Sequence, residues 1–175
     1  GFNSLAVSAI GNDELGAEIK ETFDKAGLKY MLQVTEYPTG TVTVDIDERG
    51  IPSYDIKENV AYDYMSYTPQ LEEVAKKCNV ACFGSMTQRN PVSRKTIRKF
   101  LESMPQTVET YKVFDINLRQ HFYDKEIISE SLRLCNVFKI NDEELIIVKK
   151  MFGLDDKSDH DACMRLIEEW DLKFL

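Results

Sequence analysis

The stretch that decides the fold is YKVFDINLRQHFYDKEIISESLRLCNVFKINDEEL, residues 111–145. Two short apolar runs, Tyr111–Ile116 and Val137–Ile140, predict strands, and the residues between them show helical periodicity over Asp124–Cys135. Continuous apolar strands separated by helices of this length are typical of a parallel sheet covered by helices on both faces. The stretch therefore predicts an α/β fold.

The same alternation of strand and helix extends toward both ends of the chain. The expected strands are Leu5–Ile10 and Val80–Phe83, with another beginning in Leu172–Leu175, and the expected helices are Leu15–Ala26, Pro91–Met104, Asp142–Phe152 and Asp159–Trp170. We therefore predict a doubly wound, mostly parallel sheet.

One segment, Thr39–Tyr64, breaks this rhythm. It alternates with period two around a turn at DERG, Asp47–Gly50, and predicts an antiparallel hairpin with a third strand or extension at Asn59–Tyr64. Such an insertion is either an edge hairpin or a lid, and the pattern alone leaves both interpretations open.

Composition restricts the partners. The chain has 175 residues, of which 43% are hydrophobic and 30% are charged, and its net charge is −8. We expect no nucleic acid and no membrane as partner, because both favour a basic surface. The basic run Ser93–Lys99 is interpreted as a solvated helix face. The four cysteines and two histidines form no ligand cluster, so we expect reduced thiols in a cytoplasmic protein.

Polar residues follow the predicted strands, where open α/β sheets bind their ligands. Gly84 and Ser85 follow one strand, and in an extended segment Asp115, Asn117 and Arg119 share a face. These three side chains could hold a polyhydroxylated ligand and an anion, or Asp115 and Arg119 could form an ion pair that fixes the loop.

Two further candidates open the next helix. Asn141 and Glu144 have the spacing of a capping box, and the alternative is that they face a polyphosphate and a magnesium-bound water. In contrast, GNDELG, residues 11–16, lacks the Lys-Ser/Thr ending of a phosphate-binding loop. We interpret it as a strand-to-helix corner with Asp13 as the helix cap.

Four motifs in this order resemble the PfkB, or ribokinase-like, carbohydrate kinase family: AIGNDELG, PTGTVTVDIDERG, FDINLR and KINDEEL. The D-x-N-x-R form is most similar to the fructokinase branch. The resemblance implies a ribokinase-like fold, transfer of the γ-phosphate of ATP to a sugar hydroxyl with Mg²⁺, and a small β-lid that closes over the sugar and contributes to homodimer contacts. Residues 1–34 and 68–175 would be parts of one α/β kinase domain and residues 35–67 the lid insertion.

The resemblance also implies site residues. Val42, Val44, Gly84, Ser85 and Asn117 match positions around the sugar. The catalytic residue would be Arg119, near the transferred phosphate, and ATP and magnesium would lie by Asn141 and Glu144, with Glu144 acting on the metal through water. The lid lining does not distinguish fructose from a ketodeoxy sugar acid, ribose or a nucleoside, and a non-catalytic domain that binds sugar or self-associates is a further alternative.

The sequence also departs from the family. QHFYD, residues 120–124, replaces the Leu-Trp that usually follows the Arg in fructokinases, and the signature Gly-Ala-Gly-Asp, which supplies the anion hole and the catalytic base, does not occur. We therefore expect these residues to be the middle of a sugar kinase, cut at both ends and inactive alone.

Overall fold

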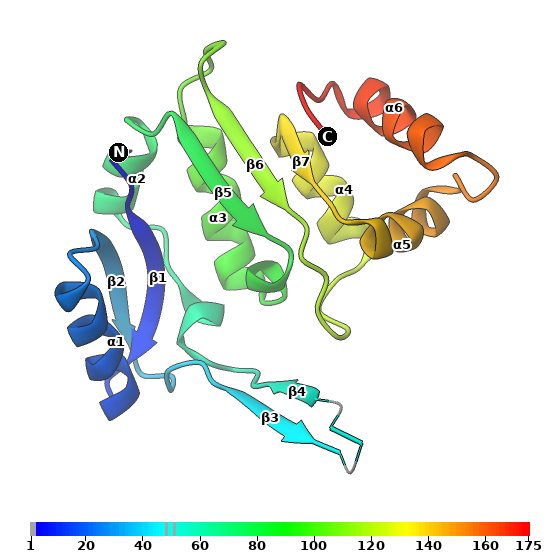
Figure 1. The fold of residues 1–175 in the computed structure, drawn as a ribbon. Coiled ribbons are helices and arrows are strands. Elements are labelled where there is room, and N and C mark those ends of the chain that lie inside the picture. Colours follow the sequence, from blue (N-terminus) through cyan, green and yellow to red (C-terminus); the bar gives the residue numbers. More distant parts are fainter. Residues whose placement is uncertain (1–2, 48, 51) are drawn as a thin grey trace. The chain divides into compact units, whose positions relative to one another are not determined.

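The computed structural model describes residues 3–47, 49–50 and 52–175. The chain divides into two compact units, Gly1–Ser66 and Tyr67–Leu175. The first unit contains a parallel strand pair and an antiparallel strand pair, and the second contains a three-stranded parallel sheet; each unit also has helices (Figure 1). The units are described separately below.

The first unit is built on a parallel strand pair. β1 (Ala6–Gly11) and β2 (Tyr30–Thr35) pair in parallel, and α1 (Glu14–Lys25) forms the crossover between them (Figure 1). The strand β2 was not predicted from the sequence. The corner between β1 and α1 is closed by the carboxylate of Asp13, which accepts the backbone N–H of Gly16 at 2.8 Å. Asp13 is thus the helix cap, as predicted.

The first unit also contains the expected antiparallel hairpin. β3 (Val42–Ile46) pairs with β4 (Pro52–Ile56), and Val44 lies opposite Tyr54. The predicted turn at DERG includes Glu48, which lies outside the described residues. The backbone N–H of Gly50 donates to the carbonyl of Asp47 at 2.9 Å, across this turn.

The prediction of a third strand or extension at Asn59–Tyr64 is wrong. Ala61–Tyr64 is a short 3-10 helix, η1. The buried carboxylate of Asp63 accepts the backbone N–H of Val60 at 3.2 Å and so closes a turn in place of an extended pairing. Asn59 has φ of 56°, which also ends any extended run.

The second unit has a three-stranded parallel sheet in the order β5-β6-β7. Its strands are β5 (Val80–Gly84), β6 (Tyr111–Asp115) and β7 (Val137–Lys139). Its helices are α2 (Pro69–Ala75), the 3-10 turn η2 (Met86–Gln88), α3 (Pro91–Ser103), α4 (Lys125–Leu134), α5 (Asp142–Phe152) and α6 (Asp159–Trp170). The final expected strand is reduced to a single bridge between Val137 and Phe174. The prediction of an α/β fold with parallel strands and an antiparallel insertion is confirmed.

Side chains that alternate along β6 and β7 place apolar rings in the core and polar groups on the opposite face of the sheet. The rings of Phe114 and Phe138 stack within the core, where they meet the apolar side chains of α4, α5 and α6. The next residue on each strand, Asp115 on β6 and Lys139 on β7, points to the opposite face, because side chains alternate along a strand. This arrangement leaves polar groups at the carboxyl ends of the strands.

Candidate functional site

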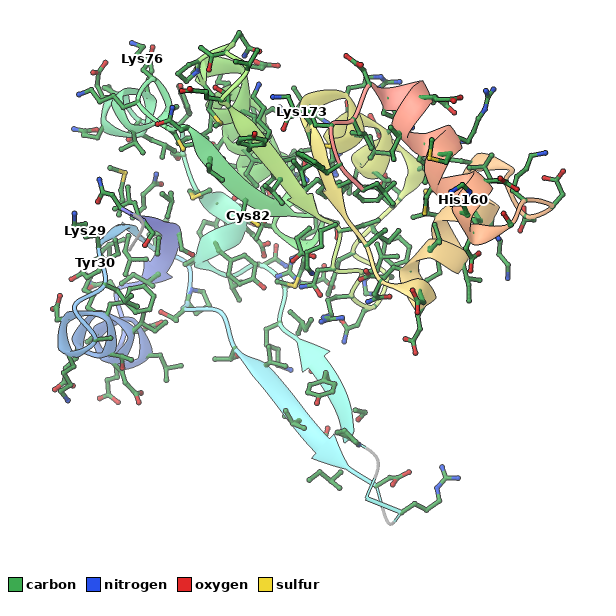
Figure 2. The ribbon with its side chains drawn as sticks, turned by 45° about the horizontal axis from the view of Figure 1, so that its top comes forward. Lys29, Tyr30, Lys76, Cys82, His160 and Lys173 are labelled. Atoms are coloured by element: carbon green, nitrogen blue, oxygen red, sulfur yellow. The ribbon has the colours of Figure 1, made fainter. Side chains whose placement is uncertain are left out.

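A hollow of about 260 Å³ lies at the carboxyl ends of β5 and β6. It is lined by Cys82, Phe83, Gly84, Ser85, Met86, Thr87, Asp115 and Asn117. Figure 2 labels Cys82, on β5. The hollow is near the lower limit of the volumes of small-molecule sites, ~300–1,000 Å³. Four of the residues predicted to gather at the strand ends therefore do so: Gly84, Ser85, Asp115 and Asn117.

The segment after β6 alternates between core and site. Ile116 and Leu118 are buried in the core, whereas Asn117 and Arg119 are exposed. The hydroxyl of Ser85 is itself buried and donates to the carbonyl of Ile116 at 2.6 Å. Ser85 therefore anchors the segment by its side chain while it lines the hollow.

The charge partner of Asp115 is Lys139. The Lys139 ammonium lies 3.0 Å and 2.9 Å from the two carboxylate oxygens of Asp115. The guanidinium of Arg119 instead donates to the carbonyl of Leu118 at 3.1 Å. The Asp115–Arg119 ion pair, one of the two open interpretations, is therefore replaced by a pair between adjacent strands.

Lys139 is a site residue that the sequence reasoning missed. It is the direct register partner of Asp115 across β6 and β7. The hydrogen bond to Asp115 raises the pKa of the Lys139 ammonium, which stays charged at neutral pH. No local signal identified it, because its pairing with Asp115 depends on the register of β6 against β7.

The start of α5 has the hydrogen bonds of a capping box. The side chain of Asn141 accepts the N–H of Glu144 at 2.9 Å, and the Glu144 carboxylate accepts the N–H of Asn141 at 3.1 Å. The second carboxylate oxygen of Glu144 accepts the N–H of Leu118 at 2.9 Å. Both carboxylate oxygens of Glu144 therefore accept backbone N–H groups, and a role of Asn141 and Glu144 toward ATP and magnesium remains a prediction.

Val42 and Val44 lie on β3 in the first unit. Their exposed fractions are 52% and 49%, and the register places them on the same face of the hairpin as Tyr54 and Ile56. Their contact with a sugar remains a prediction.

The Gly-Asn-Asp corner after β1 is held by side-chain hydrogen bonds. The Asp13 carboxylate accepts both the hydroxyl of Thr39 at 2.6 Å and its backbone N–H at 2.8 Å, and the Thr39 hydroxyl accepts the N–H of Gly11 at 2.9 Å. The hydrogen bond from Thr39 lowers the pKa of Asp13, so the cap stays ionised. The Asp13 carboxylate and the Thr39 hydroxyl are therefore engaged in hydrogen bonds within the fold, as expected of a structural turn.

Among residues 3–47, 49–50 and 52–175, no group of three or more His, Cys, Asp or Glu is placed to hold a metal ion. In the same residues, no helix has the length and apolar character needed to cross a membrane.

Open α/β proteins bind small ligands at the carboxyl ends of their parallel strands, which is the edge where this hollow and its polar groups lie. A model of the pfkB family carbohydrate kinases matches residues 1–169, so the chain belongs to this family. The uncharacterized sugar kinase PH1459 of Pyrococcus horikoshii is 26% identical over 157 residues, which are 85% of this chain and 50% of the relative. The chain therefore spans about half the length of the curated relative it matches.

Solved structures share the fold. The structure of PH1459 in complex with ATP has a TM-score of 0.73 at 23% identity and covers 89% of this chain and 53% of that one. Fructokinase from Xylella fastidiosa has a TM-score of 0.79 at 16% identity and covers 97% and 53%. A PfkB family carbohydrate kinase from Listeria grayi has a TM-score of 0.81 at 13% identity and covers 99% and 56%.

Proposed function

We propose that the complete protein transfers the γ-phosphate of ATP to a hydroxyl group of a sugar, with Mg²⁺ as the metal ion and fructose as the first candidate sugar. The observation that carries this proposal is the hollow shared by Gly84, Ser85, Asp115 and Asn117 in a chain of this family. A carboxylate and an amide are suited to bind sugar hydroxyls. Arg119 follows two residues after Asn117 and supplies a guanidinium that suits phosphate.

Each site residue has a proposed role. Asn117 binds the sugar, and Gly84 and Ser85 border it. Arg119 stabilises the charge of the phosphoryl group during transfer, which is where such enzymes gain most of their rate. Asn141 and Glu144 lie on the ATP and magnesium side, where the N-terminus of α5 also favours negative charge. The catalytic base and the anion hole are assigned to the family's Gly-Ala-Gly-Asp segment, which has no counterpart in this sequence, so these residues alone are proposed to be inactive.

The hairpin is proposed to be the lid, comprising residues 35–67, on an α/β domain made of residues 1–34 and 68–175. Its apolar residues share one face: Val42, Val44, Ile46, Pro52, Tyr54 and Ile56. An isolated two-stranded ribbon is only marginally stable in water, so an apolar face of this kind is suited to cover a ligand or another chain. We propose that it covers the sugar and contributes to a homodimer in the cytoplasm.

A substrate panel on the full-length protein tests the proposal. Purified enzyme is incubated with ATP and Mg²⁺ and with fructose, a ketodeoxy sugar acid, ribose or a nucleoside, and ADP release is measured. We expect fructose to be phosphorylated. We expect Arg119→Ala to lower kcat by a factor of ~10² or more, as for other groups that stabilise transition-state charge. Arg165→Ala on α6, whose side chain is exposed, is the matched control with unchanged kcat.

The panel also separates the alternatives. Turnover of another compound with none for fructose moves the assignment to that substrate within the family. Sugar binding by calorimetry without turnover of any compound favours a non-catalytic domain and contradicts the kinase proposal. Full activity of the Arg119→Ala variant removes Arg119 from the mechanism.

A further inference from the structure

The Glu144 carboxylate joins two segments that lie 26 residues apart in the sequence. Its Oε2 accepts the N–H of Asn141 at 3.1 Å within α5, and its Oε1 accepts the N–H of Leu118 at 2.9 Å in the loop after β6. The side chain is only 8% exposed. A hydrogen bond to an ionised acceptor in such a setting is about twice as strong as a neutral one.

The N–H that Glu144 holds belongs to the peptide group between Asn117 and Leu118. Asn117 has φ of 40°, a left-handed conformation that Asn tolerates better than other residues with a side chain. The side chain of Leu118 is anchored in the core, and its carbonyl accepts the Arg119 guanidinium at 3.1 Å. Leu118, whose N–H Glu144 holds, therefore stands between Asn117 and Arg119, the two residues of this loop that are proposed to contact the substrate.

We propose that Glu144 is a positioning residue for Ile116–Arg119, the segment after β6 that we call the substrate loop. Its carboxylate fixes the Asn117–Leu118 peptide, and this orients Asn117 at the hollow and Arg119 beside it. The inference rests on the proposed kinase function and deepens it, since Glu144 then affects catalysis indirectly, by holding the substrate loop in place. Misplacement of a reacting group by about 1 Å costs on the order of 10²-fold in rate, so the loss of this hydrogen bond is expected to act on kcat.

Substitution separates the hydrogen bond from the charge. Glu144→Gln keeps one oxygen that can accept the Leu118 N–H and removes the negative charge, whereas Glu144→Ala removes both. In the full-length protein at saturating Mg²⁺ we expect Glu144→Ala to lower kcat ~10²-fold and Glu144→Gln to lower it less than ~10-fold. An equally large loss of kcat in both variants at saturating Mg²⁺ would overturn the proposal, because it would show that the charge and not the hydrogen bond matters.

A double-mutant cycle tests whether Glu144→Ala lowers kcat by disturbing Arg119. If Glu144 acts through the loop, Glu144→Ala has a much smaller effect on kcat in an Arg119→Lys background than in the wild type, because residues that act as a unit are not additive. Equal effects in both backgrounds would contradict a role through the loop. Ser158→Ala is the matched control, since it removes the cap of α6, where Ser158 accepts the N–H of Asp161 at 3.1 Å. We expect it to lower stability and leave kcat unchanged.

Amide hydrogen exchange tests the positioning role of Glu144 without measuring kinase activity. We expect the N–H of Leu118 to exchange at least ~10-fold faster in Glu144→Ala than in the wild type, and to stay protected in Glu144→Gln. Equal protection of Leu118 in all three proteins refutes the positioning role, whatever the substrate panel gives. Absence of turnover in the wild type, together with the expected exchange pattern, refutes the kinase proposal alone.

Discussion

Replacing Thr39 by Val tests how the corner after β1 is held. Thr39 is 5% exposed, and its hydroxyl accepts the N–H of Gly11 at 2.9 Å while it donates to the Asp13 carboxylate at 2.6 Å. Val has nearly the same shape, so the change opens no cavity, but it leaves the N–H of Gly11 buried without its acceptor. An orphaned buried donor costs ~1–3 kcal/mol, and we expect the free energy of unfolding to fall by this amount.

Urea denaturation followed by far-UV circular dichroism gives this free energy, provided that the m value is unchanged. Trp170, the only tryptophan, lies in the second unit, so its fluorescence does not report on this corner. Thr39→Ser retains the hydroxyl and is the matched control. Amide exchange at Gly11 should accelerate in the Val variant and stay slow in the Ser variant. A Val variant with wild-type stability and a protected Gly11 N–H would refute the reasoning.

Three further outcomes are expected. The hydrogen bond from Thr39 lowers the pKa of Asp13, so its stabilisation is complete above the ordinary pKa of 3.8 and is lost as the pH falls through the lower pKa of the folded state. Stability measured by urea midpoints should therefore fall below pH ~4, and Asp13→Asn should flatten this fall. Phe138→Ala, in the core of the second unit, should cost ~3–5 kcal/mol in the same measurement. Cys82 is exposed in the hollow, whereas burial raises the pKa of the Cys135 thiol to about 12, so iodoacetamide at pH 8 should label Cys82 first.

Each of these outcomes has a clear contradiction. An Asp13→Asn variant with the acid sensitivity of the wild type would assign that sensitivity to other carboxylates. Phe138→Ala should cost far more than Val108→Ala, whose side chain is exposed, and equal effects would contradict the assigned core. Labelling of Cys135 as fast as Cys82, measured by peptide mass spectrometry, would contradict its burial. Under the proposed function, a bound sugar slows labelling of Cys82.

Local signals were sufficient to predict many elements. α5 and α6 begin and end at the predicted residues, because Asn141 and Ser158 cap their N-termini and Gly153, with φ of 70°, ends α5. Such signals act within a few residues and are visible in the sequence. The strand β2 was missed because its residues are mostly half-buried and lack a clear alternation. Tyr30–Thr35 forms a strand because it pairs in parallel with β1, and this pairing is a tertiary contact.

The candidate site was predictable only in part. The sequence by itself determined that Gly84, Ser85, Asp115 and Asn117 lie at or just after the carboxyl ends of strands, and the carboxyl ends of parallel strands meet at one edge. Only the tertiary structure decided that Asp115 pairs with Lys139, because that contact depends on strand register.

The same holds for Glu144. Its spacing from Asn141 is a local signal that predicted the capping box, and the structure has those hydrogen bonds. Its bond to Leu118 joins residues far apart in the chain, and no local pattern encodes such a distance. The sequence therefore determined which residues could act, and the tertiary structure, which brings the start of α5 to the loop after β6, decided which hydrogen bonds they make.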